Sequence, residues 1–202
     1  MALTPELPGL PTLAWTHGEG LATPHPGEAA LTMVSRGGDD WVDDASGAPP
    51  QHSASSLGFL AAGDLMLSAR VRVDAPRSTF DAGVLTLWAD DAHYAKLCFE
   101  RAPQGSEMVV SIVTDRWSDD VNSGAVDAGE VYLRVARIGP AWAFHRSADG
   151  HRWDFVRLFR LNTEGPVRVG FMAQAPLGPP CTARFDQIRY TGTTLTQLRD
   201  GS

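Results

Sequence analysis

The chain has 202 residues, a formal net charge of −7 and 43% hydrophobic residues. This length suits one domain with a sizeable core, and the composition is that of an ordinary globular protein. The negative charge and the lack of any Lys/Arg run argue against nucleic-acid binding, because phosphate backbones are usually met by a basic patch. No apolar run reaches the roughly 18 residues of a membrane span, so no membrane contact is predicted.

The two ends of the chain differ in composition from its middle. Residues 1–12 are rich in Pro and Leu and are predicted to form a lead-in over a sheet. They carry neither the basic nor the apolar region of a signal peptide, so we expect a cytoplasmic protein. Residues 13–191 are predicted to form the domain, followed by a fraying tail at 192–202. Cys98 and Cys181 match no zinc or CxxC spacing and are expected to be buried and reduced.

The middle of the chain carries strand signals in regular succession. Residues 30–35 predict a short strand, and a polar, acidic loop around Trp41 follows it. Later segments alternate apolar and polar residues and are separated by turn signals such as Asp149-Gly150. These segments are residues 65–73, 83–89, 94–100, 108–114, 131–138, 141–147, 153–159, 167–174 and 182–190. No helical period is sustained, so we predict an all-β, two-sheet antiparallel β-sandwich with less than about 10% helix.

Candidate binding residues follow from the alternation of side chains along these strands. If the apolar set faces the core, the polar set lines a groove on the outer face of a curved sheet. The residues assigned to that groove are Trp88, Lys96, Glu100, Arg134, His145, Arg157 and Gln174. Aromatic rings stack on sugars while charged groups bond their hydroxyls, so this set suits a carbohydrate or another polar small molecule. The alternative is a solvated ladder of cross-strand ion pairs without a ligand.

Catalysis and metal binding have weaker support. Glycoside hydrolysis needs paired carboxylates, and the Glu-x-Asp-x-x-Glu pattern of laminarinase-type sandwiches is missing. Glu100 is the one carboxylate assigned to the middle of the groove, with Asp115 and Asp119 near a strand end. We therefore predict no catalytic residue, metal ligand or cofactor. The acidic loop Asp39–Asp44 lacks the spacing of a calcium loop, so a solvated loop is favoured, although calcium binding stays open.

Several short motifs occur in an order that resembles one protein family. They are Phe80-Asp81-Ala82-Gly83-Val84, Tyr94-Ala95-Lys96 with Glu100, Val113-Thr114 with Ser118-Asp119, Tyr132-Leu133-Arg134-Val135, Ser147-x-Asp149-Gly150-x-x-Trp153, Val169-Gly170-Phe171-Met172-Ala173 and Ala183-Arg184-Phe185-Asp186. Over residues 12–191 the chain resembles the regulation-of-enolase family, a domain of unknown function. Asp39-Asp40-Trp41 is similar to that family's early Asp-Phe-Trp element. The resemblance implies a concanavalin A-like lectin and glucanase jelly roll, but it implies no reaction.

Three functions remain open on the sequence. The preferred one is a non-catalytic module that holds a carbohydrate-like ligand on the concave sheet. The second is an intracellular regulatory domain that contacts a protein partner through this face or through the acidic loop. The third is a glycan-active hydrolase centred on Glu100, which the missing paired-acid motif disfavours.

Overall fold

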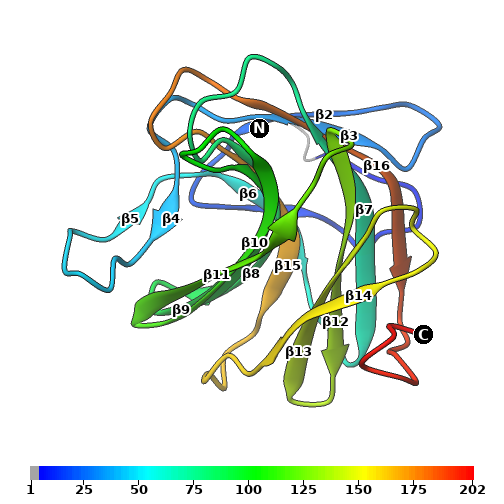
Figure 1. Cartoon of the computed structure of the whole chain (residues 1–202). Coiled ribbons are helices and arrows are strands. Elements are labelled where there is room, and N and C mark those ends of the chain that lie inside the picture. The colour runs from blue at the N-terminus through cyan, green and yellow to red at the C-terminus, as the bar shows by residue number, and fades with distance from the viewer. Residues whose placement is uncertain (1–4) are drawn as a thin grey trace.

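Figure 1 shows the computed structural model of the chain, which describes residues 5–202. Two seven-stranded antiparallel sheets pack face to face, and a two-stranded sheet lies beside them. The predicted all-β sandwich is confirmed, and the fold is a concanavalin A-like jelly roll. With no helix anywhere in residues 5–202, none is available to span a bilayer.

Each sheet combines a run of consecutive strands with strands from distant parts of the chain. Sheet A has the order β1 (Ala14–Thr16), β6 (Ser56–Leu60), β15 (Arg168–Gln174), β8 (Ala82–Asp90), β9 (His93–Arg101), β10 (Glu107–Asp115) and β11 (Trp117–Ala125). Sheet B has the order β14 (Asp154–Phe159), β13 (Ala141–Ser147), β12 (Glu130–Ile138), β7 (Leu65–Val73), β16 (Thr182–Thr191), β3 (Leu31–Val34) and β2 (Leu21–Pro24). The small sheet pairs β4 (Trp41–Val42) with β5 (Gln51–His52). In Figure 1, sheet A curves around this β4–β5 hairpin.

The core between the sheets follows the predicted alternation. Leu85, Leu97, Leu133 and Phe144 are fully buried in one cluster, each on the face that its strand pattern assigned to the interior. Because side chains of a strand point alternately to its two faces, their neighbours point outward. The outer face of sheet A has its own apolar cluster, in which Trp41 of the small sheet packs against it.

Two of the strands that were not predicted lack the apolar alternation of a half-buried strand. The segment Trp117–Ala125 is polar and forms β11, the exposed edge strand of sheet A. An edge strand pairs on one side only and buries little, so its sequence lacks the apolar alternation on which the prediction depends. The segment Ser56–Leu60 forms β6 and is almost wholly buried. Because both of its faces are covered, its sequence does not alternate between apolar and polar residues.

Strict two-residue alternation over the predicted strand 153–159 would place Phe155 and Phe159 on one face, and the structure contradicts this expectation. In the structure Phe155 packs against His145 outside sheet B, whereas Phe159 packs against Phe144 in the core. The register between β13 and β14 shifts between Phe144 and His145, and such an irregularity moves the following residues to the other face.

Both terminal segments pack against the sandwich. Leu7 of the lead-in lies in the core cluster, while residues 1–4 lie outside the described part of the chain. In the tail, Leu195 and Leu198 pack on the outer face of sheet B. The ring N–H of His145 also donates to the carbonyl of Leu198 at 2.7 Å.

Both cysteines are free and buried, so their thiols should react only after unfolding. Burial raises the pKa of Cys98 well above its ordinary value and raises the pKa of Cys181 to about 12. Since the thiolate is the reactive form, we expect Ellman's reagent at pH 8 to detect no thiol in the native protein. It should detect both thiols in unreduced protein in guanidinium, and a deficit there would contradict the assignment.

Candidate functional site

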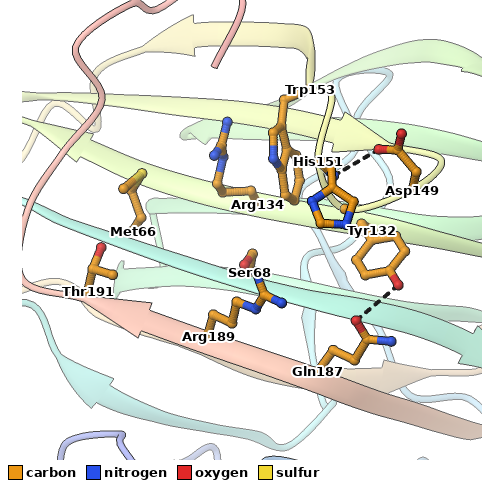
Figure 2. A pocket seen from close by; sticks show the side chains of 11 residues that line it. Met66, Ser68, Tyr132, Arg134, Asp149, His151, Trp153, Gln187, Arg189 and Thr191 are labelled. Atoms are coloured by element: carbon orange, nitrogen blue, oxygen red, sulfur yellow. Dashed lines mark hydrogen bonds between the residues drawn. The ribbon is translucent and has the colours of Figure 1, made fainter. Parts of the chain in front are cut away.

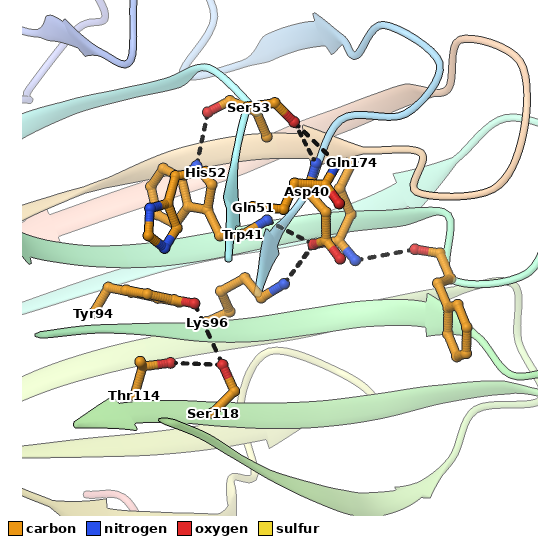
Figure 3. Close-up of polar contacts among 12 residues, drawn as sticks. Asp40, Trp41, Gln51, His52, Ser53, Tyr94, Lys96, Thr114, Ser118 and Gln174 are labelled. Atoms are coloured by element: carbon orange, nitrogen blue, oxygen red, sulfur yellow. Dashed lines mark hydrogen bonds and ion pairs between the residues drawn. The ribbon is translucent and has the colours of Figure 1, made fainter. Parts of the chain in front are cut away.

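A cavity of about 460 Å³ opens on the concave outer face of sheet A. Strands β9, β10, β11 and β15 form its floor and walls, and the loop that contains β4 closes one side (Figure 3). This concave cavity is defined here by Asp40, Phe80, Lys96, Glu100, Asp120 and Gln174. Val110 and Ile112 of β10 give it an apolar floor.

Lys96 is the central cation of the concave cavity and is only 3% exposed. Its ammonium donates to Asp40 Oδ1 at 2.7 Å and to Gln174 Oε1 at 3.0 Å (Figure 3). Burial is the largest single influence and disfavours the charge, but Asp40 and the neighbouring acidic groups Cys98 and Glu100 together raise the pKa of Lys96. Asp40 lies 56 residues earlier in the chain, so this ion pair fastens the loop to the sheet.

Gln174 connects this ion pair to the rim of the cavity. Its amide nitrogen donates to the carbonyl of Phe80 at 3.0 Å. Phe80 has a φ of +67°, a left-handed conformation that is uncommon for a residue other than glycine. Its N–H donates to the carbonyl of Arg101 at 2.8 Å, which fixes the strained turn beside the cavity.

Glu100 is a nearly buried carboxyl of the cavity that has no hydrogen-bond or ion-pair partner within residues 5–202. It is 8% exposed and lines the cavity. Burial raises its pKa to about 7; Lys96 opposes this shift, while Asp40 and Asp120 add to it. Partial burial also raises the pKa of Asp120, which stands at the exposed side of the cavity. The cavity therefore contains a carboxyl group that is available for a hydrogen bond and has a pKa near neutral pH.

An aromatic wall borders the concave cavity on the β4–β5 side. Trp41 is fully buried and its indole N–H donates to the carbonyl of Ala54 at 2.8 Å. Trp88 stacks on Tyr94 with ring centroids 5.3 Å apart, and Trp41 packs against both. Ring contacts of this kind contribute beyond area burial, so the wall is a rigid support for the loop.

The acidic loop is largely buried, which corrects the expectation of a solvated loop. Asp39 and Asp43 are each less than one-tenth exposed. The Asp43 carboxylate accepts from Tyr94 Oη at 2.7 Å and from the ring nitrogen of His52 at 2.8 Å. The loop's acids thus have separate protein partners. Within residues 5–202, no cluster of three or more His, Cys, Asp or Glu residues is arranged to hold a metal ion.

The seven residues assigned to one groove lie on two different sheets. Lys96, Glu100 and Gln174 come together in the concave cavity, and Trp88 stands beside it in the aromatic wall. The other three residues, Arg134, His145 and Arg157, do not share this face. The single seven-residue groove is therefore wrong.

The seven residues were assigned to one groove because the alternation of side chains along a strand does not show to which sheet the strand belongs. Arg134 and His145 do point away from the core, as predicted, but β12 and β13 belong to sheet B. Alternation distinguishes core from surface, whereas sheet membership depends on long-range pairing. Arg157 extends from the edge strand β14 to Asp119 of β11, donating to its carbonyl at 3.1 Å.

Sequence reasoning missed two acids of the cavity. Asp40 was placed in a loop without a partner, and its one signal was the Asp39-Asp40-Trp41 element. Asp120 sits on β11, a strand that was not predicted, and Asp119 beside it faces the other way. Both acids enter the cavity through tertiary contacts that no local pattern specifies.

Comparisons with known proteins agree on family and fold. Residues 22–193 match the model of the family described as "Protein of unknown function (DUF1349)". No curated protein matches the chain. A functionally unknown protein from Saccharomyces cerevisiae superposes with a TM-score of 0.79 at 22% identity, over 89% of this chain and 95% of its own.

Two enzymes share the fold at lower identity. The xylan beta-1,4-xylosidase from Bacillus halodurans C-125 aligns with a TM-score of 0.63 and 16% identity, over 81% of this chain but 33% of that one. The alginate lyase from Klebsiella pneumoniae gives 0.54 and 11%, over 80% and 81%. These identities establish the fold alone. The chain spans about a third of the length of the xylosidase. The likeness to the regulation-of-enolase family remains a resemblance, because the matching family model carries a different description. This chain belongs to the DUF1349 family of proteins of unknown function, on a jelly-roll fold that resembles those of carbohydrate-active proteins.

Proposed function

We propose that the concave cavity binds a neutral, hydroxyl-rich ligand of carbohydrate type without transforming it. Glu100 carries the proposal: a nearly buried carboxyl with no hydrogen bond in residues 5–202 faces a cavity of about 460 Å³. A carboxyl that faces a cavity can accept a hydrogen bond from a ligand hydroxyl, and such a bond to a charged group is stronger than one between neutral groups.

The other groups of the cavity fit the same chemistry. Lys96 is held in place by Asp40 and Gln174, so one donor is already oriented. Val110 and Ile112 offer an apolar floor, and the ring of Phe80 lines the rim, as the weakly polar face of a sugar requires.

The charge of the cavity selects against anionic ligands. Its carboxyl groups belong to Asp40, Asp44, Glu100 and Asp120, and Lys96 is its one basic residue. A ligand that carries a carboxylate or phosphate would be repelled. The likeness in fold to proteins named as a xylosidase and an alginate lyase supports a carbohydrate by analogy.

A glycan array of neutral and acidic oligosaccharides, followed by calorimetry on the strongest neutral ligand, tests this function. Glu100→Gln should weaken that ligand by about 10- to 100-fold, because a hydrogen bond to a charged group contributes about 1.5–3 kcal/mol. Glu164→Gln, an exposed Glu outside the cavity, is the matched control and should bind like wild type. No neutral ligand on the array, or equal affinity in both variants, would contradict the proposal.

One observation favours hydrolysis as a second candidate. A carboxyl with a pKa of about 7 suits a general acid at neutral pH. Incubating the bound glycan with stoichiometric protein and measuring new reducing ends separates the two functions. If new reducing ends form with wild type but not with Glu100→Gln, the protein is a hydrolase. If the glycan stays intact, the protein is a binding module.

A further inference from the structure

A second pocket lies on the opposite side of the molecule, on the outer face of sheet B (Figure 2). Its volume is about 160 Å³, and we define it as the Arg134 pocket by Ser68, Tyr132, Arg134, Trp153 and Arg189. Ser68 of β7 pairs in register with Arg134 of β12 and with Arg189 of β16. Neighbouring strands lie about 4.8 Å apart, so the two arginines flank the serine within reach of one small ligand.

Arg134 is a buried cation without an acidic partner in residues 5–202. It is 7% exposed, and its guanidinium carbon lies 4.0 Å from the centroid of the Trp153 ring. One nitrogen, Nη2, donates to the carbonyl of Gly201 at 2.5 Å, while Nε is buried without a hydrogen-bond partner. Buried charges are normally paired, and burial here lowers the pKa of Arg134 to about 10.

Arg189 is the second positive charge of the pocket. It is exposed and makes no ion pair or side-chain hydrogen bond within the described residues. Other arginines of this outer face are paired, since Arg70 and Arg72 both contact Asp186. The acids of the face are thus engaged outside the pocket, and Arg189 stays available.

Asp149 is the one carboxylate that lines the pocket, and its side chain is hydrogen-bonded within its own turn. It accepts the backbone N–H groups of His151 and Arg152, each at 2.8 Å, and the hydroxyl of Ser147 at 3.1 Å. These hydrogen bonds lower the pKa of Asp149 to about 2. In Figure 2 a dashed line joins the Asp149 carboxylate to His151 of the same turn.

We propose that the Arg134 pocket binds a small oxyanion, the phosphate, sulfate or carboxylate group of a metabolite, between Arg134 and Arg189 over Ser68. Guanidinium groups match the geometry of such anions, and the serine hydroxyl adds a third donor. The Trp153 ring holds the Arg134 guanidinium by cation–π contact, so the donor is oriented before the anion arrives. This site is independent of the concave cavity, whose charge has the opposite sign.

Titration of ¹⁵N-labelled protein with inorganic phosphate, sulfate and acetate at low ionic strength tests the site, with sodium chloride as the reference. We expect saturable shifts for Ser68, Arg134, Trp153 and Arg189 with at least one oxyanion and not with chloride. Arg189→Gln should weaken binding at least tenfold, and added salt should weaken it further because exposed charges are screened. Arg160→Gln, an exposed arginine outside the pocket, should bind like wild type.

The three anions separate the sources of the ligand group. Stronger binding of phosphate and sulfate than of acetate assigns the pocket to esters of these acids, and equal or stronger acetate binding assigns it to carboxylates. Arg189 is exposed, so its variant should keep the wild-type amide spectrum apart from nearby signals. No saturable shift with any of the three anions, or equal binding in Arg189→Gln, would overturn the proposal.

Discussion

Asp40→Ala should lower the free energy of unfolding by about 3–5 kcal/mol, the cost typical of leaving one member of a buried ion pair uncompensated. Lys96 is almost fully buried, and the Asp40 carboxylate is its ion-pair partner at 2.7 Å. Gln174 remains as a neutral hydrogen-bond partner, which does not replace a charge. The variant should also loosen the loop, because the ion pair joins it to sheet A.

Urea denaturation at pH 7 measures this effect. Asp44→Ala removes a half-buried carboxylate of the same loop that bonds only to Ser46 of its own turn, so its unfolding midpoint should stay much closer to wild type. Adding Lys96→Met to Asp40→Ala should recover part of the loss, because the double variant no longer buries the ammonium that Asp40 compensates. Equal midpoints for the Asp40 and Asp44 variants would show that the ion pair does not stabilise the fold.

Glu100→Gln should stabilise the protein at pH 8 by about 2–3 kcal/mol and leave it unchanged near pH 4. The pKa of Glu100 rises from 4.5 to about 7 on folding, so the folded state binds the proton more tightly than the unfolded state. Stability then falls as pH rises from about 4.5 to 7 and stays low above that range. One pKa unit corresponds to about 1.36 kcal/mol, so the full shift sets an upper value of about 3.4 kcal/mol, and solvent in the open cavity lowers the expected effect below it.

The difference between the unfolding free energies of Glu100→Gln and wild type, followed from pH 4 to pH 8, tests this linkage. It should grow through the interval from 4.5 to 7 and then level off. Glu164→Gln should follow wild type at every pH. A pH-independent difference would mean that Glu100 does not carry a raised pKa. The expected gain in stability on losing Glu100 is typical of a residue kept for function at a cost to the fold.

The sequence sufficed for the fold because the core residues alternate strictly. The pattern around Leu85, Leu97 and Leu133 places each side chain correctly in the interior. The same alternation correctly turned Lys96, Glu100 and Arg134 outward. In each case one local rule, the two-residue period of a strand, decides the outcome.

The site was only partly predictable because it depends on contacts between distant segments. Alternation does not say that β9 and β12 belong to different sheets, so Arg134 was joined to the wrong cluster. Asp40 contacts Lys96 across 56 positions, and Asp120 belongs to an edge strand without an apolar signature. A structure is needed to place such residues together.

A chemical-shift map of the strongest neutral glycan on ¹⁵N-labelled protein tests the proposed binding site in the concave cavity. We predict saturable shifts centred on Lys96, Glu100, Val110, Ile112 and Gln174, with no shift around Trp153 on the opposite side of the molecule. The same titration of Glu100→Gln should need about 10- to 100-fold more glycan. Shifts confined to sheet B, or no shifts at the concave cavity at any soluble glycan concentration, would show that the cavity is not the binding site.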